Sequence, residues 1–190
     1  SHDILATERL LLNILSHLSG ISTHTNKIVR IAKKVNPNVE ILATRKTLPG
    51  LRDIEKRAVV HGGGATHRMR LDDAILIKDN HLKLSKNIKK SIEISRSKYP
   101  NLMVEVEADN EQQAIEIAKN GADRVMLDNF SPDEATATIR KLREISDIEI
   151  EISGGVTIEN IASYAKKADF ISLGSLTMSS LPVDFSLHVL

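Results

Sequence analysis

The stretch ILATRKTLPGLR, residues 41–52, runs from three apolar residues through two adjacent cations into a Pro-Gly turn. The apolar residues are typical of the end of a short strand, and Pro49-Gly50 is typical of a turn that opens a helix. This helix is expected to end at the glycines of HGGGATHR, residues 61–68. The stretch therefore predicts a strand–loop–helix unit that presents Arg45 and Lys46 directly after the strand.

The rest of the chain repeats this unit. Short apolar runs alternate with segments of helical period, bounded by glycine, proline and asparagine. A helical lead-in at about 3–36 comes first, and its first helix, 4–18, is expected to stop at Gly20 before a second helix. We then expect strands at 39–43, 74–77, 102–106, 124–127, 148–152 and 170–173, and helices at 51–60, 84–97, 110–119, 132–144 and 157–166, with a short turn at the C-terminus.

Six strand-then-helix units with short connections predict parallel strands and right-handed crossovers. Periodicity alone leaves both a barrel and a doubly wound sheet open. Polar or glycine residues follow all six strands. A barrel builds its site from every strand end, whereas a doubly wound sheet uses one crevice. We therefore predict one α/β domain over residues 1–190, folded as a (β/α) barrel with fewer than eight parallel strands.

The composition restricts the class of partner. The chain has 190 residues, of which 41% are hydrophobic and 27% charged, as in ordinary globular domains. Aromatic residues make up only 3% and the net charge is +1, which argues against a base-stacking or generally basic surface. There is no cysteine and no apolar run of membrane-spanning length. We expect a cytoplasmic protein that binds neither nucleic acid nor membranes.

Five positively charged or ionisable side chains lie near strand ends or after the triple glycine. They are Arg45, Lys46, His67, Arg68 and Lys78. Arginine suits bidentate binding of carboxylate or phosphate, and lysine supplies a point charge. Each cation alone also fits a solvated loop, and the glycines also fit a flexible turn. Repetition of the arrangement favours a site for a small, multiply anionic molecule.

Two later strand ends carry candidate phosphate loops. Ser153-Gly154-Gly155 lies between a strand and a helix, where backbone amides reach an anion. Gly174-Ser175 follows the last strand, matching the phosphate site that barrels place on their final loops. Together the two loops predict that the ligand is phosphorylated.

Carboxylates follow two neighbouring strands. Glu107 and Asp128 fit a hydrated Mg²⁺ that bridges to a phosphorylated substrate, or acceptors for sugar hydroxyls. The alternative is that they pair with Lys78 or Arg45. Whether Glu105, Glu149 and Glu151 face inward or outward stays open, and His17, His24, His61, His81 and His188 have no metal-ligand spacing, so we interpret them as surface or structural residues. Cations, phosphate loops and paired acids together indicate phosphoribosyl transfer to an aromatic acid.

The motifs, in their order, resemble the quinolinate phosphoribosyltransferase family, also called nicotinate-nucleotide pyrophosphorylase (carboxylating). The resemblance runs from about Glu8 to the C-terminus, over the barrel domain of that family. It rests on TRKTLPGLR (44–52), GGGATHR (62–68), LIKDNH (76–81), VEVE (104–107), MLDN (126–129) and SGG (153–155). It implies a Mg²⁺-dependent enzyme of NAD biosynthesis that makes nicotinate mononucleotide, pyrophosphate and CO₂ from quinolinate and phosphoribosyl pyrophosphate.

The resemblance also implies roles for the candidate residues. Arg45, His67, Arg68 and Lys78 would hold the carboxylates of quinolinate, with Lys46 nearer the phosphoribosyl donor. Lys78, Glu107 and Asp128 would be catalytic, the two acids facing the ribose and Mg²⁺. The substrate-binding residues on the phosphate side would be Asn129, Ser153, Gly154, Gly155, Gly174 and Ser175. Arg9 would reach the site of a neighbouring subunit in a homodimer or higher homo-oligomer.

The chain departs from the family pattern at two points. The small N-terminal domain of the family is expected to be absent, and Met178 stands where similar sequences often carry histidine in the last loop. Two alternatives therefore stay open: a phosphoribosyltransferase for nicotinate or another base, and a catalytically silent barrel module. A fold alone does not decide between them.

Overall fold

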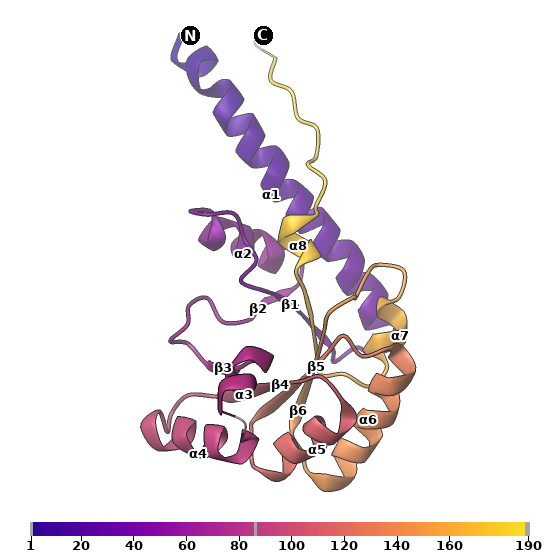
Figure 1. Ribbon diagram of the computed structural model, residues 1–190. Helices are drawn as coiled ribbons and strands as arrows, with labels where there is room; N and C mark the ends of the chain where they lie inside the picture. The colour runs from indigo at the N-terminus through magenta and orange to yellow at the C-terminus, as the bar shows by residue number, and fades with distance from the viewer. Residues whose placement is uncertain (1, 86, 189–190) are drawn as a thin grey trace.

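The computed structural model describes residues 2–85 and 87–188 and shows an α/β fold with a long N-terminal helix (Figure 1). Side chains are described from residue 6 onward. The strands are β1 (Glu40–Ala43), β2 (Ala65–Thr66), β3 (Ile75–Ile77), β4 (Val104–Ala108), β5 (Arg124–Asp128), β6 (Glu149–Ser153) and β7 (Phe170–Leu173). The helices are α1 (His2–Val35), α2 (Arg52–His61), α3 (Asp79–Ser85), α4 (Ile88–Lys98), α5 (Glu111–Lys119), α6 (Pro132–Ile145), α7 (Ile161–Ala165) and α8 (Ser175–Met178).

The described strands form one parallel sheet in the order β2-β1-β7-β6-β5-β4-β3. The sheet curls into a half-barrel whose outer strands are β2 and β3. The prediction of a barrel with fewer than eight parallel strands is confirmed. The sheet gains β2 over the six predicted strands, because two residues after the triple glycine pair with β1.

Apolar and charged side chains alternate along the strands, so the two faces of the sheet differ in polarity. In β4, Val104, Val106 and Ala108 belong to the hydrophobic core, on which α4 and α5 pack. Glu105 and Glu107, between them, point into the half-barrel. The pattern repeats in β5 and β6. Since successive side chains of a strand face opposite sides, the core lies between sheet and helices while the charged residues line the interior.

The prediction that Gly20 stops the first helix was wrong. α1 continues through Gly20 to Val35 as one helix of 34 residues. The glycine serves a tertiary contact instead, because a Cβ at Gly20 would collide with the backbone oxygen of Leu181. The chain after α8 crosses α1 here, and the amide of Val183 donates to Ser16 O at 3.0 Å.

Smaller differences from the predicted elements concern boundaries. The helix predicted at 84–97 is divided into α3 and α4, and Lys86 between them lies outside the described residues. The strand predicted at 102–106 lies at 104–108, so Glu107 is a strand residue rather than the first loop residue. The helix predicted at 157–166 is regular only over α7. The boundaries of the strands differ from the predicted ones by a residue or two. They depend on hydrogen bonds to neighbouring strands and on burial, which a local sequence pattern does not contain.

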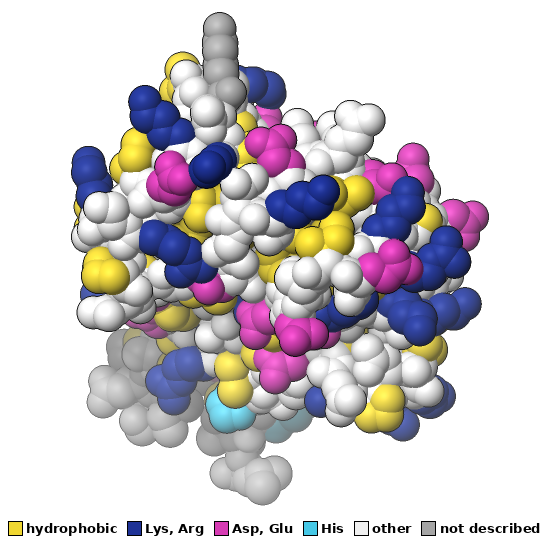
Figure 2. Space-filling model, turned by 90° about the horizontal axis from the view of Figure 1, so that it is seen from below, with side chains coloured by type: hydrophobic (Ala, Val, Ile, Leu, Met, Phe, Trp, Pro, Cys, Tyr) yellow, Lys and Arg dark blue, Asp and Glu magenta, His cyan; other side chains and the backbone are white. Residues whose placement is uncertain are grey.

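The outer surface is that of ordinary exposed helices. Figure 2 shows Lys and Arg side chains mixed with Asp and Glu on the face seen from below. Among the residues that the structure describes, no helix has the length and hydropathy needed to cross a bilayer.

Candidate active site

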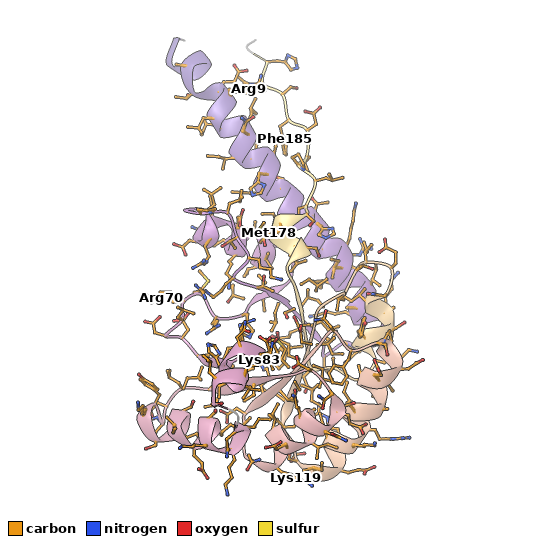
Figure 3. The ribbon with its side chains drawn as sticks, in the orientation of Figure 1. Arg9, Arg70, Lys83, Lys119, Met178 and Phe185 are labelled. Carbon is orange, nitrogen blue, oxygen red and sulfur yellow. The ribbon has the colours of Figure 1, made fainter. Side chains whose placement is uncertain are left out.

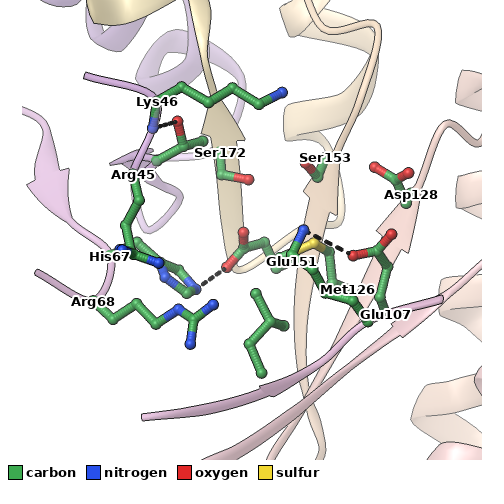
Figure 4. Close-up of a pocket in the computed structure, with 13 residues that line it drawn as sticks. Arg45, Lys46, His67, Arg68, Glu107, Met126, Asp128, Glu151, Ser153 and Ser172 are labelled. Atoms are coloured by element: carbon green, nitrogen blue, oxygen red, sulfur yellow. Dashed lines mark hydrogen bonds and ion pairs between the residues drawn. The ribbon is translucent and has the colours of Figure 1, made fainter. Parts of the chain in front are cut away.

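A pocket of about 340 Å³ opens at the carboxyl ends of the strands (Figure 4). This volume suits a small molecule. Eight predicted site residues line it: Arg45, Lys46, His67, Arg68, Lys78, Glu107, Asp128 and Ser153. Figure 4 shows Arg45, His67 and Arg68 on one side and Glu107, Asp128 and Ser153 on the other. The structure therefore brings together residues that span more than half of the chain.

Within residues 2–85 and 87–188, the guanidinium groups of the cationic side form no ion pair with a carboxylate. Arg45 follows β1, and its buried Nε has no hydrogen-bond partner in the described structure. Arg68 donates through Nη1 to Ala74 O at 3.3 Å, and its pKa is lowered by burial and by the charge of Arg45. Two neighbouring guanidinium groups that disfavour each other electrostatically form a site for an anion.

The loop that carries Arg68 is held from inside. Lys56 of α2 is fully buried and donates from Nζ to Arg68 O at 2.7 Å. Burial, together with the nearby charges of Arg52 and Arg45, lowers the pKa of Lys56 to about 8. Asp73 accepts from the amides of Met69 and Arg70, each at 2.9 Å. This loop is thus fixed by backbone contacts, leaving the Arg68 side chain directed to the pocket.

His67 forms the link between the pocket and the charged barrel interior. Its Nε2 lies 2.7 Å from Glu105 Oε2 and 3.4 Å from Glu151 Oε2. Both carboxylates are fully buried. Although burial opposes the charge, the hydrogen bonds to Glu105 and Glu151 raise the pKa of His67 to about 9. His67 is therefore an imidazolium at neutral pH and adds a positive charge to the cationic side.

These three side chains also offer one ligand atom each within 4.8 Å of one another, the arrangement of a possible cation site. Arg124 already donates to Glu151 Oε2 at 3.3 Å. A metal would have to displace the proton of His67 and compete with the Arg124 guanidinium. The arrangement is better described as an ion-pair cluster.

We expect His67 to titrate near pH 9 in the folded protein. Because this value lies above the ordinary 6.5, the protonated ring contributes stability that is fully present below about pH 6.5 and is lost as the pH rises through about 9. The advantage of wild type over His67→Gln in free energy of unfolding should therefore shrink across this range. Histidine ring NMR and urea unfolding at several pH values provide the measurement.

The comparison with His67→Gln isolates this effect from Lys56. A buried lysine whose pKa is lowered to about 8 gives the opposite trend, with stability rising as the pH increases toward 10.5. Subtracting the free energy of unfolding of His67→Gln from that of wild type at each pH removes the contribution of Lys56, which both proteins share. A midpoint for His67 near 6.5 would contradict the ion-pair cluster.

The acidic side of the pocket is built by β4 and β5. Glu107 accepts from Lys78 Nζ at 3.3 Å, and Asp128 lies at the end of β5. Burial raises the pKa of both carboxyls, and Lys78 opposes the rise. The pairing of Glu107 with Lys78, an alternative in the sequence, is thus present. It leaves Asp128 Oδ1 and Glu107 Oε1 available to a ligand.

The loop after β6 adjoins Asp128. Gly154 and Gly155 have φ values of 80° and 62°, which glycine adopts without steric cost. Asn129, although not a glycine, also has a positive φ, of 58°, and it donates from Nδ2 to Asp128 Oδ2 at 2.6 Å. Its own amide donates to Ser153 O at 2.9 Å. The two loops therefore hold each other in a fixed conformation.

The second glycine loop makes room for Lys46. A Cβ at Gly174 would lie 3.0 Å from Lys46 Cδ. Thr177 of α8 donates from its hydroxyl to Lys46 O. Lys46 therefore crosses the last loop, with its backbone held by α8.

Other predicted residues do not line the pocket. Asn129, Gly154, Gly155, Gly174 and Ser175 belong to the two loops beside it. Arg9 lies on the N-terminal part of α1, far from the pocket, with 76% of its side chain exposed (Figure 3). Met178, at the end of α8, is also exposed and does not line the pocket. The predicted site residues thus lie at one end of the barrel, except for Arg9.

Sequence reasoning missed several lining residues: Thr44, Leu76, Met126, Glu151 and Ser172. A signal was present for Glu151. In EIEIS the isoleucines must pack beneath helices, so Glu151, the glutamate between them, faces the barrel interior. The buried Lys56 was also missed, because its position on an amphipathic helix resembles that of an exposed lysine.

Comparison with known proteins agrees with this geometry. The sequence matches the family described as quinolinate phosphoribosyl transferase, C-terminal domain, over residues 21–188. The chain belongs to this family. It is 45% identical to the probable nicotinate-nucleotide pyrophosphorylase [carboxylating] of Archaeoglobus fulgidus, covering all of this chain and 74% of that protein.

Further relatives show the same extent of similarity. The chain is 37% identical to nicotinate-nucleotide pyrophosphorylase [carboxylating] of Homo sapiens, over all of this chain and 65% of that protein. The crystal structure of NadC from Streptococcus pyogenes superposes with a TM-score of 0.89 at 39% identity, covering 96% of this chain and 64% of that one. The quinolinate phosphoribosyltransferase family is thus confirmed by sequence and by fold, over about two thirds of the length of these relatives.

Proposed function

We propose that this protein transfers the phosphoribosyl group of phosphoribosyl pyrophosphate to quinolinate with decarboxylation. The ring nitrogen of quinolinate displaces pyrophosphate at the anomeric carbon, and the carbon beside it loses CO₂ and gains a proton. The observation that carries the proposal is one pocket in which Arg45 and Arg68, neither in an ion pair with a carboxylate of the described residues, face Glu107 and Asp128 (Figure 4). The family membership supports the same reaction.

The cationic side suits the two adjacent carboxylates of quinolinate. Arg45 offers the unpartnered Nε, Arg68 its remaining guanidinium donors, and His67 a second ring N–H. Bidentate guanidinium–carboxylate pairs fix both position and orientation. Holding the ring at both carboxylates would align its nitrogen with the acidic side, where the ribose binds.

The acidic side suits the phosphoribosyl donor. Cleavage of the anomeric bond leaves positive charge on the sugar, and carboxylates aimed at that charge stabilise the transition state. Glu107 and Asp128 line the pocket and would supply these carboxylates, while Lys78 is paired with Glu107. Ser153, Gly154 and Gly155 would bind the phosphate through the hydroxyl and backbone amides, as would Gly174 and Ser175, with Lys46 between the loops.

The acidic side also fits Mg²⁺. This ion takes one or two carboxylates and completes its shell with water and substrate phosphate oxygens. Glu107 and Asp128 would hold it, since both are partly buried carboxylates whose pKa values are raised and which face the same pocket. When bound, the ion neutralises the charge of the pyrophosphate leaving group.

The ratio of kcat/KM for quinolinate to that for nicotinate tests this proposal. Nicotinate has one carboxylate, so it would leave part of the cationic side desolvated and without a counter-charge. Leaving one partner of a buried charge pair alone costs about 2–5 kcal/mol. At about 1.4 kcal/mol for each factor of ten, quinolinate should exceed nicotinate in kcat/KM by about 30-fold or more.

The measurement is steady-state turnover of both acids with phosphoribosyl pyrophosphate and Mg²⁺. Equal values or a preference for nicotinate would assign the protein to a phosphoribosyltransferase for another base. Absence of turnover with either acid would favour the silent module.

We further propose that a second copy of the chain contributes Arg9 to the site. Arg9 is exposed on the part of α1 that extends from the body of the fold (Figures 1 and 3). The same stretch exposes Leu10, Leu11 and Leu15 by 64%, 62% and 48%. Exposed leucines beside an arginine are typical of a protein interface.

A mixing experiment tests this arrangement. Arg9→Ala should lower kcat/KM by about tenfold or more, the loss expected for one charge-assisted hydrogen bond. In a symmetric dimer, mixing Arg9→Ala with the pocket variant Arg68→Ala would give half hybrids with one intact site each, and so about a quarter of wild-type activity. Arg30→Ala on the same helix is the control. No recovery on mixing, after exchange of subunits is verified, would place Arg9 outside the partner's site.

A further inference from the structure

The interior of the half-barrel contains a charged cluster, of which the proposed reaction uses only His67 directly. His67, Glu105, Arg124 and Glu151 come from four different segments and are all buried or nearly so. With His67 protonated and both carboxylates ionised, the four side chains carry two positive and two negative charges; burial raises the pKa of Glu105 to about 7. Such a balanced cluster is retained where it determines one arrangement of the buried groups.

Glu151 lies at the centre of this cluster. Its Oε2 lies 3.3 Å from Arg124 Nη1 and 3.4 Å from His67 Nε2. It also lines the pocket, where Figure 4 shows it between the cationic and acidic sides. Its Oε1 is buried, and the side chain of Ser172 on β7 lies beside the carboxylate. The carboxylate therefore has one cation on each side of its Oε2.

Arg124 is itself fixed from the base of the barrel. Its Nε and Nη2 donate to Glu149 Oε2 at 3.0 and 2.8 Å. Its guanidinium lies 3.7 Å from the centre of the Phe170 ring, a cation–π contact. Phe170, Arg124, Glu151 and His67 thus form a continuous set of contacts from the base of the barrel to the pocket.

The His67 ring has its two nitrogens in different surroundings. Nε2 faces Glu105 and Glu151, whereas Nδ1 has no protein partner within residues 2–85 and 87–188. A carboxylate pair on one nitrogen fixes the ring plane and makes the other nitrogen a donor. We propose that Glu151, held by Arg124, is a positioning residue that turns the Nδ1–H of His67 toward a substrate carboxylate. This inference rests on the proposed function, because the acceptor is a carboxylate of quinolinate.

The charges that face His67 come from every neighbouring element. Arg45 and Arg68 lie on the pocket side, Glu105 on β4, Arg124 on β5 and Glu151 on β6. The arginines keep their charge at any ordinary pH. Removing the charge of Glu151 therefore lowers the affinity of His67 for its proton.

The variant Glu151→Gln tests the inference in the full-length protein, because it keeps the size of the side chain. The KM for quinolinate should rise about tenfold or more, while the KM for phosphoribosyl pyrophosphate changes by less than about twofold. The NMR titration midpoint of His67 should fall by about one pH unit or more. Glu149→Gln is the matched control, since Glu149 lies on the same strand and binds Arg124 without contacting His67.

A double variant separates positioning from a direct role in binding. If Glu151 acts through His67, Glu151→Gln in a His67→Gln background should cause no further loss. The inference would be overturned if the losses in quinolinate binding of the two single variants multiplied in the double variant. It would also be overturned if Glu149→Gln had the same effects as Glu151→Gln, or if the titration midpoint of His67 did not change in Glu151→Gln. Wild type with quinolinate supplies a measurement that needs no variant: the ¹⁵N shift of His67 Nδ1 should change on binding. A change confined to Nε2 would overturn the proposal.

The two proposals fail differently. If wild type binds and converts quinolinate but His67 is unaffected by Glu151→Gln, only the positioning role is lost. If wild type does not use quinolinate, the proposed function is lost, and the His67 titration still decides whether Glu151 controls the ring.

Discussion

Arg68→Ala should lower kcat/KM for quinolinate by about 30-fold to a few thousandfold, the range for removing one member of a buried charge pair. Arg68 lines the pocket beside Arg45, and within the described residues its guanidinium forms no ion pair with a protein carboxylate. Its positive charge is therefore available to a substrate carboxylate. The KM for phosphoribosyl pyrophosphate should change little, because Arg68 lies across the pocket from Asp128 and Ser153 (Figure 4). Steady-state kinetics with each substrate varied in turn provides the measurement.

Arg70→Ala is the matched control for this variant. Arg70 belongs to the same loop, but 76% of its side chain is exposed and it does not line the pocket. Its removal should leave both KM values within about twofold, as expected for an exposed surface charge. Equal losses in the two variants would mean that the loop, rather than the Arg68 guanidinium, determines binding of the acid.

Gly154→Ala should lower the free energy of unfolding by about 2–4 kcal/mol, the sum of a left-handed backbone strain and a steric clash. Gly154 has a φ of 80°. A Cβ there would collide with Asn129 Oδ1 and lie 2.8 Å from the Asn129 amide nitrogen. Asn129 would have to move away from Asp128, so Mg²⁺-dependent turnover should fall along with stability. Urea unfolding and turnover of the same samples provide the two measurements.

Two other glycines separate strain from clash. Gly121 and Gly155 have φ values of 77° and 62°, and nothing lies within 4 Å of a Cβ at either position. Their alanine variants should each lose about 1–2 kcal/mol, the strain contribution alone. Gly155→Ala lies in the same loop and Gly121→Ala lies away from it, so turnover should be affected only in the first. A loss for Gly154→Ala no larger than theirs would mean that Asn129 yields without cost.

The sequence by itself determined the repeated strand–helix unit, the parallel sheet and the end of the barrel that carries the site. These follow from local signals: apolar runs, helical periodicity, and cations or glycines placed directly after strands. Because parallel strands joined by crossovers end on the same side, Arg45, Lys78 and Asp128 were bound to converge. The family motifs added the chemical roles, since they lie within those same loops.

Only the tertiary structure decided the continuity of α1, the pairing of β2 and the interior charge cluster. Gly20 does not end its helix, because helix packing around a crossing chain segment outweighs the low helix propensity of one glycine. The two residues of β2 are too short to produce a periodic signal and become a strand through hydrogen bonds to β1. Glu105 and Glu151 could face either side until the strand register placed them on His67. Contacts of this kind join residues far apart in the chain, so no local pattern contains them.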